Sequence, residues 1–291
     1  MKACTAIADA VDAGAPLGAA AEQVIAALGD ENKDVSGMAL YILQTEAERN
    51  PSGGTVDALR TAMTSDAVAV RRNAAFLLAG FLARLEDGAG VAALLADADP
   101  VVLAGVLKAL ADGAIPRART DAVVAAVVPL LAHAELNVRK EATWVLYLLA
   151  TAGTAIDAAV PALEGMLDDA ATQGNAAIAL SYALHTTNQG SRADASYERA
   201  SGPIQMGTAW GAADAALRSE DLPALKKLFS SENDNVRRGL GGLLNYAQKR
   251  RRDISLAGTA FNELEREHPD DALLHARIYG VLDIVKRGPT S

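Results

Sequence analysis

Cysteine, aromatic residues and positive charge are all scarce in this chain. Cys4 is the only cysteine among 291 residues, which excludes an intrachain disulfide and a cysteine-based metal cluster. Aromatic residues make up 4% of the sequence, and the formal net charge is −9. A chain this acidic lacks the basic footprint that general binding to nucleic acid or to an anionic membrane requires. We therefore do not expect nucleic acid to be the partner.

Long apolar runs are also missing. No uninterrupted apolar stretch approaches the roughly 18 residues that a membrane-crossing helix needs, so we expect no membrane segment. Asp9 and Asp12 interrupt the alanine-rich stretch near the N-terminus, so we expect no signal peptide. Together these features lead us to expect a cytoplasmic protein.

Motifs that carry catalysis or metal binding are absent as well. The sequence holds no G-x-x-x-x-G-K-[ST] loop, no G-x-S-x-G elbow and no C-x-x-C pair. None of its four histidines lies in a zinc-ligand pattern such as H-E-x-x-H. They are His133, His185, His268 and His275. We therefore predict no catalytic residue, no metal site and no cofactor. An enzymatic role is the less favoured hypothesis.

Small and aliphatic residues are abundant instead. Hydrophobic residues make up 51% of the chain, and alanine accounts for 63 of the 291 positions. Alanine has the best helix propensity and lets helix backbones approach closely. Gly239, Gly241 and Gly242 fall within a helical pattern, so we expect them to permit close packing rather than to bind phosphate. The composition favours an all-α fold of stacked helices.

A repeat of about 34 residues runs along the chain. Each copy has a short polar or acidic turn, an aliphatic anchor, two small or basic residues, and then an amphipathic run rich in leucine and alanine. The anchors recur every 32 to 36 residues. They are Val35, Val70, Val102, Val138, Thr172, Ile204 and Val236, and eight residues later stand Leu43, Leu78, Leu110, Leu146, Leu180, Ala212 and Leu244.

A second apolar pattern precedes most anchors. Pairs spaced by four residues, such as Val24 and Leu28 or Leu225 and Phe229, indicate another amphipathic helix upstream of the polar turn. Each repeat is therefore predicted to be a helical hairpin that buries its apolar face only by stacking on its neighbours. The predicted repeats are 16–50, 51–86, 87–115, 116–152, 153–187, 188–219, 220–252 and 253–287. Segment 188–203 is polar, and we expect a degenerate or partly irregular helix there.

The pattern resembles HEAT repeats, especially the short bacterial kind related to the phycobilin-lyase HEAT-like group. The residues that carry the resemblance are Asn137-Val138-Arg139 with Ala142 and Leu146, and Val70-Arg71 with Ala74 and Leu78. Leu103, Gln173 and Gln205 depart from it, since they replace the basic residue after the anchor. The resemblance implies an α-α superhelix over residues 1–291, a HEAT-type solenoid of seven to eight hairpins whose second helices line the concave surface.

One side of the second helices mixes aromatic, basic and small residues. Trp144 and Trp210 occupy the same repeat position as Tyr41 and Phe76. Aromatic and arginine side chains are typical of protein-binding hot spots, although the aromatic rings could instead fill gaps between repeats. The predicted binding residues are Trp144, Trp210, Tyr147, Phe76, Tyr41, Arg72, Lys108, Lys140, Arg238 and Lys249.

Two other charged patterns have a structural interpretation. Acidic turns followed by basic pairs, as in Asp66 with Arg71 and Arg72, are expected to cap helices, and the resemblance implies that such charges pair from repeat to repeat. Contact with a ligand is the alternative. The basic run 249–252 is expected to be a solvated helix end.

The function predicted from these patterns is a scaffold that binds a protein or peptide, and the basic residues of the face favour an acidic or phosphorylated one. Two alternatives stay open at this point, a phycobilin-lyase-like subunit that handles a chromophore and a nucleic-acid-binding HEAT-like protein. The sequence does not indicate the oligomeric state.

Overall fold

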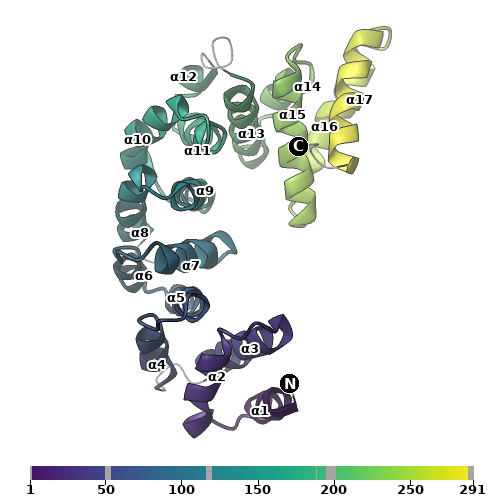
Figure 1. Ribbon diagram of the computed structural model, residues 1–291. Helices are drawn as coiled ribbons and strands as arrows, with labels where there is room; N and C mark the ends of the chain where they lie inside the picture. The colour runs from purple at the N-terminus through teal and green to yellow at the C-terminus, as the bar shows by residue number, and fades with distance from the viewer. Residues whose placement is uncertain (1, 50–53, 116–119, 188, 195–200, 288–291) are drawn as a thin grey trace. The chain divides into compact units, whose positions relative to one another are not determined.

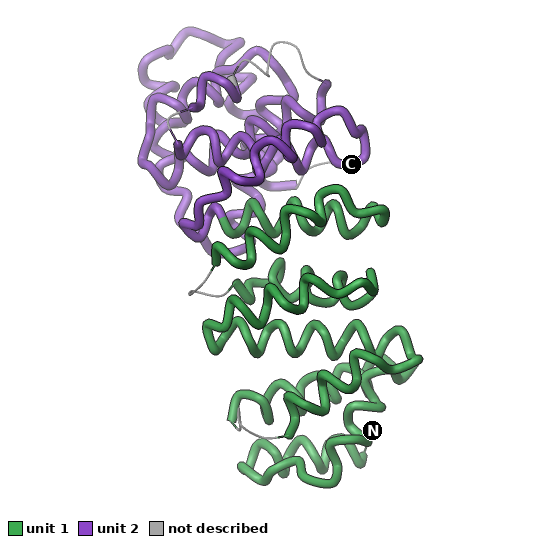
Figure 2. The backbone as a smooth tube through the Cα atoms, turned by 90° about the vertical axis from the view of Figure 1, so that its left-hand side faces the viewer, with its two compact units in different colours: residues 1–149 green, residues 150–291 purple. Residues whose placement is uncertain are grey.

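The protein is described by a computed structural model covering residues 2–49, 54–115, 120–187, 189–194 and 201–287. Within these ranges the regular structure is entirely helical, as the composition predicts. The chain divides into two compact units, residues 1–149 and 150–291 (Figure 2). Each described helix is too short or too polar to cross a membrane.

The first unit consists of two rows of helices that pack within each row (Figures 1 and 2). In one row α1 packs on α3, α3 on α5 and α5 on α7, while in the other α2 packs on α4 and α6 on α8. The helices are α1 (Lys2–Asp12), α2 (Ala21–Ala27), α3 (Lys33–Arg49), α4 (Thr55–Ala62), α5 (Val68–Arg84), α6 (Gly88–Leu94), α7 (Pro100–Ala111), α8 (Thr120–Val127) and α9 (Leu136–Thr151), the last of which ends two residues beyond the unit boundary.

The second unit repeats this arrangement. Here α11 packs on α13, α13 on α15 and α15 on α17, and α14 packs on α16 (Figure 1). Its helices are α10 (Val160–Gly165), α11 (Gln173–Thr186), α12 (Gly190–Asp194), α13 (Gly202–Arg218), α14 (Leu222–Phe229), α15 (Asp234–Lys249), α16 (Ser255–Glu267) and α17 (Ala272–Arg287). Short 3₁₀ segments at 18–20, 128–132, 157–159 and 166–168 adjoin α2, α8 and α10.

The repeat positions identified in the sequence form the core. The residues four and eight places after each anchor lie on one helix face, and all are buried in the structure. Both upstream pairs named above are buried too, Val24 with Leu28 and Leu225 with Phe229. Gly239 and Gly242 pack closely on α13, against Met206 and Trp210, and Gly241 packs on Ile284 of α17. The packing role predicted for these glycines is confirmed.

The structure differs from the predicted repeats at two places. Helix α1 lies before the first predicted repeat and packs on α3, with Ala8 and Val11 buried. Its Ile7, Ala8 and Val11 are spaced for one helix face, so the sequence carried a signal for this helix that the predicted repeats did not include. In segment 188–203 the described residues form the five-residue helix α12 and the start of α13, while 188 and 195–200 lie outside the described residues.

Candidate functional site

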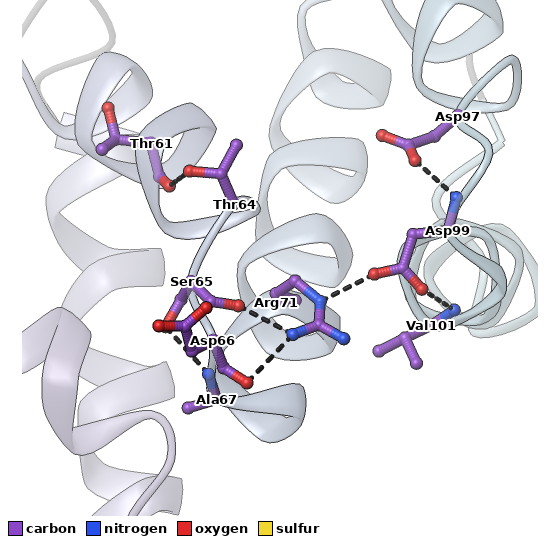
Figure 3. A network of polar contacts seen from close by, with 9 residues as sticks. All are labelled: Thr61, Thr64, Ser65, Asp66, Ala67, Arg71, Asp97, Asp99 and Val101. Atoms are coloured by element: carbon purple, nitrogen blue, oxygen red, sulfur yellow. Dashed lines mark hydrogen bonds and ion pairs between the residues drawn. The ribbon is translucent and has the colours of Figure 1, made fainter.

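The arginine that follows the anchor in the second repeat holds two repeats together (Figure 3). Arg71 donates from Nη1 to the carbonyl oxygens of Ser65, at 2.7 Å, and Asp66, at 3.1 Å. Its Nε donates to Asp99 Oδ2 at 2.7 Å, across to the turn before α7. The Asp99 carboxylate also accepts from the backbone N–H of Val101, and this bond, followed by Arg71, lowers the pKa of Asp99. The predicted pairing from repeat to repeat is confirmed for this arginine.

The contact of this arginine with its own turn recurs in two other repeats. Arg139 donates to the carbonyl oxygens of His133, at 2.8 Å, and Ala134, at 2.9 Å, and Arg237 donates to that of Ser231 at 2.6 Å. In each case the acceptor lies five or six residues before the arginine, in the polar turn. The first basic residue after the anchor therefore has a structural role, and the second basic position, at 72, 140 and 238, is the one of the pair that is left for recognition.

In the first unit the predicted residues on α3, α5 and α7 lie at the surface. Tyr41 is 48% exposed, and its hydroxyl donates to the Asp12 carboxylate at 2.9 Å. Arg72 and Lys108 are exposed and Phe76 is half-buried. We call the surface formed by Tyr41, Arg72, Phe76 and Lys108 the second-helix face of the first unit.

Helix α9 contributes three predicted residues in different environments. Lys140 and Trp144 are half-buried, whereas Tyr147 is 1% exposed. The rings of Trp144 and Tyr147 lie against one another, with centroids 4.9 Å apart. Tyr147 can therefore support the Trp144 ring but presents no surface to a partner, in contrast to the expectation that it would act as an anchor.

Of the predicted binding residues in the second unit, one packs against the core and two are exposed to solvent. Trp210 is half-buried against the core of that unit, and its ring lies over Gly242 and 5.7 Å from the Tyr246 ring. This supports the alternative that aromatic residues fill gaps between repeats, at least for Trp210. Arg238 and Lys249 are exposed, and Arg238 lies 3.7 Å from the Asp234 carboxylate on its own helix.

A groove adjoins the second-helix face of the first unit. It has a volume of about 300 Å³ and is formed by α3, α5, α7 and the turn after α7. Phe76 is the one predicted binding residue that lines it. Arg84, which also lines it, was not singled out in the sequence, because it lies at the end of α5 outside the repeat position of Arg72. The lining residues are Gln44, Phe76, Leu77, Gly80, Arg84, Ala109, Asp112, Gly113 and Ala114.

A buried carboxylate in the second unit was also missed. Asp214 has no exposed surface and pairs with Arg252, from the turn after α15, and with Arg218 Nε at 3.4 Å. Arg218 also donates to the carbonyl oxygen of Thr151 at 3.1 Å. The interpretation of 249–252 as a solvated helix end is therefore wrong for Arg252, which compensates a buried charge. The sequence held one signal for this buried carboxylate, an aspartate within the alanine-rich stretch 212–216.

Among the described residues no group of three or more His, Cys, Asp or Glu side chains is arranged to hold a metal ion. No model of a known protein family matches the chain, and no curated protein sequence matches it.

Proposed function

We propose that residues 1–291 form a HEAT-type solenoid that serves as a scaffold for a protein or peptide partner. The architecture is supported within each unit, because second helices pack on second helices and first helices on first helices. The sequence register also continues across the unit boundary, since the step from Val138 to Thr172 is of the usual length. Seven to eight such hairpins would then form one array.

The observation that carries the functional proposal is the second-helix face of the first unit. Arg72 is exposed and, among the described residues, has no carboxylate within ion-pair distance. Lys140 on α9 is likewise without a carboxylate partner in the described part of the chain. One helical turn from Arg72, the half-buried ring of Phe76 lines the groove. A cation next to a partly exposed aromatic ring in a protein of net charge −9 favours an acidic protein segment.

The two alternative functions, handling of a chromophore and binding of nucleic acid, receive less support. A groove of about 300 Å³ is at the lower limit for small-molecule sites, which makes it small for a linear tetrapyrrole. Nucleic-acid binding would need several cations along a backbone track, and Lys108 of this face already pairs with Asp112 at 2.7 Å. An acidic peptide needs fewer cations and can use the apolar groove as well.

A pull-down from cells that make the protein tests this proposal. The full chain is compared with a face variant, which carries the charge reversals Arg72→Glu and Lys108→Glu on the face and Lys140→Glu on α9. A matched control reverses three basic residues elsewhere, Arg60→Glu, Arg266→Glu and Lys286→Glu, all exposed. Circular dichroism confirms that both variants remain helical.

We expect proteins captured by the wild type and by the control to be lost from the face variant, and we expect them to contain acidic segments. Purified partner should then bind the face variant at least tenfold more weakly, since several charge pairs are reversed together. Equal capture by all three proteins would contradict the proposal. So would capture that depends on the control residues instead.

A further inference from the structure

The groove of the first unit has an apolar interior and a charged rim. Phe76, Leu77 and Gly80 of α5 and Ala109 of α7 form its interior, and Leu77 and Ala109 are buried. The rim is polar. It consists of Gln44 from α3, Arg84 from the end of α5 and Asp112 from the end of α7, all of them exposed.

Two glycines keep this space open. A Cβ atom built on Gly80 would meet only the tip of the Arg84 side chain, at 3.8 Å, within a 4 Å radius. Gly113 has φ +107°, a conformation that favours glycine, and a Cβ there would meet nothing within 4 Å. Gly80 lies inside α5, one turn before its end, and glycine within a helix costs about 1 kcal/mol relative to alanine. The free volume is thus obtained at a local cost in helix stability.

The size of the groove limits what can occupy it. Small-molecule sites usually measure about 300 to 1,000 Å³, so a volume of about 300 Å³ suits one or two side chains of a peptide. The apolar interior favours an apolar side chain, because burying it removes its surface from water without leaving a polar group unpaired.

The rim is better suited to carboxylates than to cations. Arg84 is 42% exposed, and its only carboxylate within ion-pair distance among the described residues is that of Glu48, at 3.8 Å. A contact this long at an exposed site contributes little and can be exchanged for another carboxylate. Asp112 is already neutralised by Lys108 at 2.7 Å. Arg72 lies two turns before Gly80 on the same helix and adds a second available cation.

We propose that this groove binds one large apolar side chain, leucine or phenylalanine, of an acidic peptide segment, while carboxylates that flank it contact Arg84 and Arg72. This inference rests on the proposed function and adds a sequence requirement to it. Negative charge alone would not suffice for binding, because the apolar side chain supplies the non-polar burial that exposed ion pairs lack.

Fluorescence anisotropy with the full chain and short labelled peptides tests the requirement. One peptide has glutamates around a single central phenylalanine, the second has alanine in its place, and the third has lysines for the glutamates. Gly80→Leu fills the groove and also raises helix propensity, so it should remain folded. Gly258→Leu is its matched control, since a Cβ on Gly258 of α16 would meet nothing within 4 Å. Arg84→Glu tests the rim, and an unlabelled oligothymidylate serves as competitor.

We expect the phenylalanine peptide to bind, the alanine peptide to bind about tenfold more weakly, and the lysine peptide not to bind. Gly80→Leu should lower the affinity for the phenylalanine peptide about tenfold, and Arg84→Glu should lower it severalfold. Gly258→Leu should leave this affinity unchanged. Equal affinity for phenylalanine and alanine peptides, or wild-type affinity in Gly80→Leu, would overturn the inference and leave the scaffold proposal intact. Preferential binding of oligothymidylate, or binding of no peptide, would overturn it as well. The scaffold proposal is decided separately by the pull-down.

Discussion

The backbone of α7 at Gly105 lies directly against the carbonyl oxygen of Arg72 on α5. A Cβ atom built on Gly105 would overlap that oxygen and would lie 3.0 Å from the Cβ of Ala75. The same relationship joins Gly207 to Gly174 and Gly239 to Met206. All three glycines stand three residues after their anchors. The repeat thus specifies where adjacent second helices approach most closely, and Arg72 belongs to one of these contacts through its backbone.

Substituting Gly105 with alanine should destabilise the protein. The new methyl group collides with a backbone carbonyl that cannot rotate away, so α5 and α7 must separate, at a cost of about 1–3 kcal/mol in the free energy of unfolding. Gly258→Ala is the control, since it has open space and should stabilise α16 by up to about 1 kcal/mol. Urea unfolding followed by circular dichroism measures both. Equal free energies of unfolding for Gly105→Ala and Gly258→Ala would contradict the close approach of α7 to α5 at Gly105.

Asp99 should contribute both as a helix cap and as the partner of Arg71. Asp99→Ala removes both roles and should cost about 1–2 kcal/mol, whereas Asp99→Asn keeps a good capping residue and should cost less than about 1 kcal/mol. The pKa of Asp99 is lowered in the fold, chiefly by the Val101 N–H and then by Arg71, so its charge stabilises the fold above the unfolded pKa of about 4.

The stability difference between the wild type and Asp99→Asn should therefore be constant near neutral pH. It should shrink as the pH falls below about 4, through the lowered pKa of the folded state. Denaturant unfolding at several pH values measures it. A difference that grows towards low pH would contradict the ion pair with Arg71.

Arg252 should be essential to the second unit. Arg252→Ala removes one of the two cations that pair with the buried Asp214 carboxylate, leaves the longer contact to Arg218, and should cost about 3 kcal/mol in unfolding free energy. Arg251→Ala is the neighbouring control, because Arg251 is exposed and should change stability by less than about 0.5 kcal/mol. Similar midpoints for the two variants in thermal unfolding would show that Asp214 does not depend on Arg252.

The sequence determined the helical repeat more fully than the site. The leucine and alanine positions of each second helix could be predicted because a helix repeats its faces locally, and Leu78, Leu110 and Leu146 are each 0% exposed. Contacts between helices could not be predicted in this way. The burial of Tyr147 and the pairing of Arg252 with Asp214 both depend on such contacts. The groove could not be predicted either, because it also depends on how helices pack. It lies where Gly80 and Gly113 leave space beside Phe76.

Hydroxyl-radical footprinting of the full chain, alone and with its captured partner, tests most directly whether the second-helix face of the first unit is the binding surface. Oxidation of Tyr41 and Phe76 should fall severalfold in the complex, because the partner removes these rings from water. Tyr279 and Leu273 of α17, at 51% and 72% exposure, should be oxidised equally in both states. Unchanged oxidation of Tyr41 and Phe76, with protection confined to α17 or to the first helices, would contradict the account.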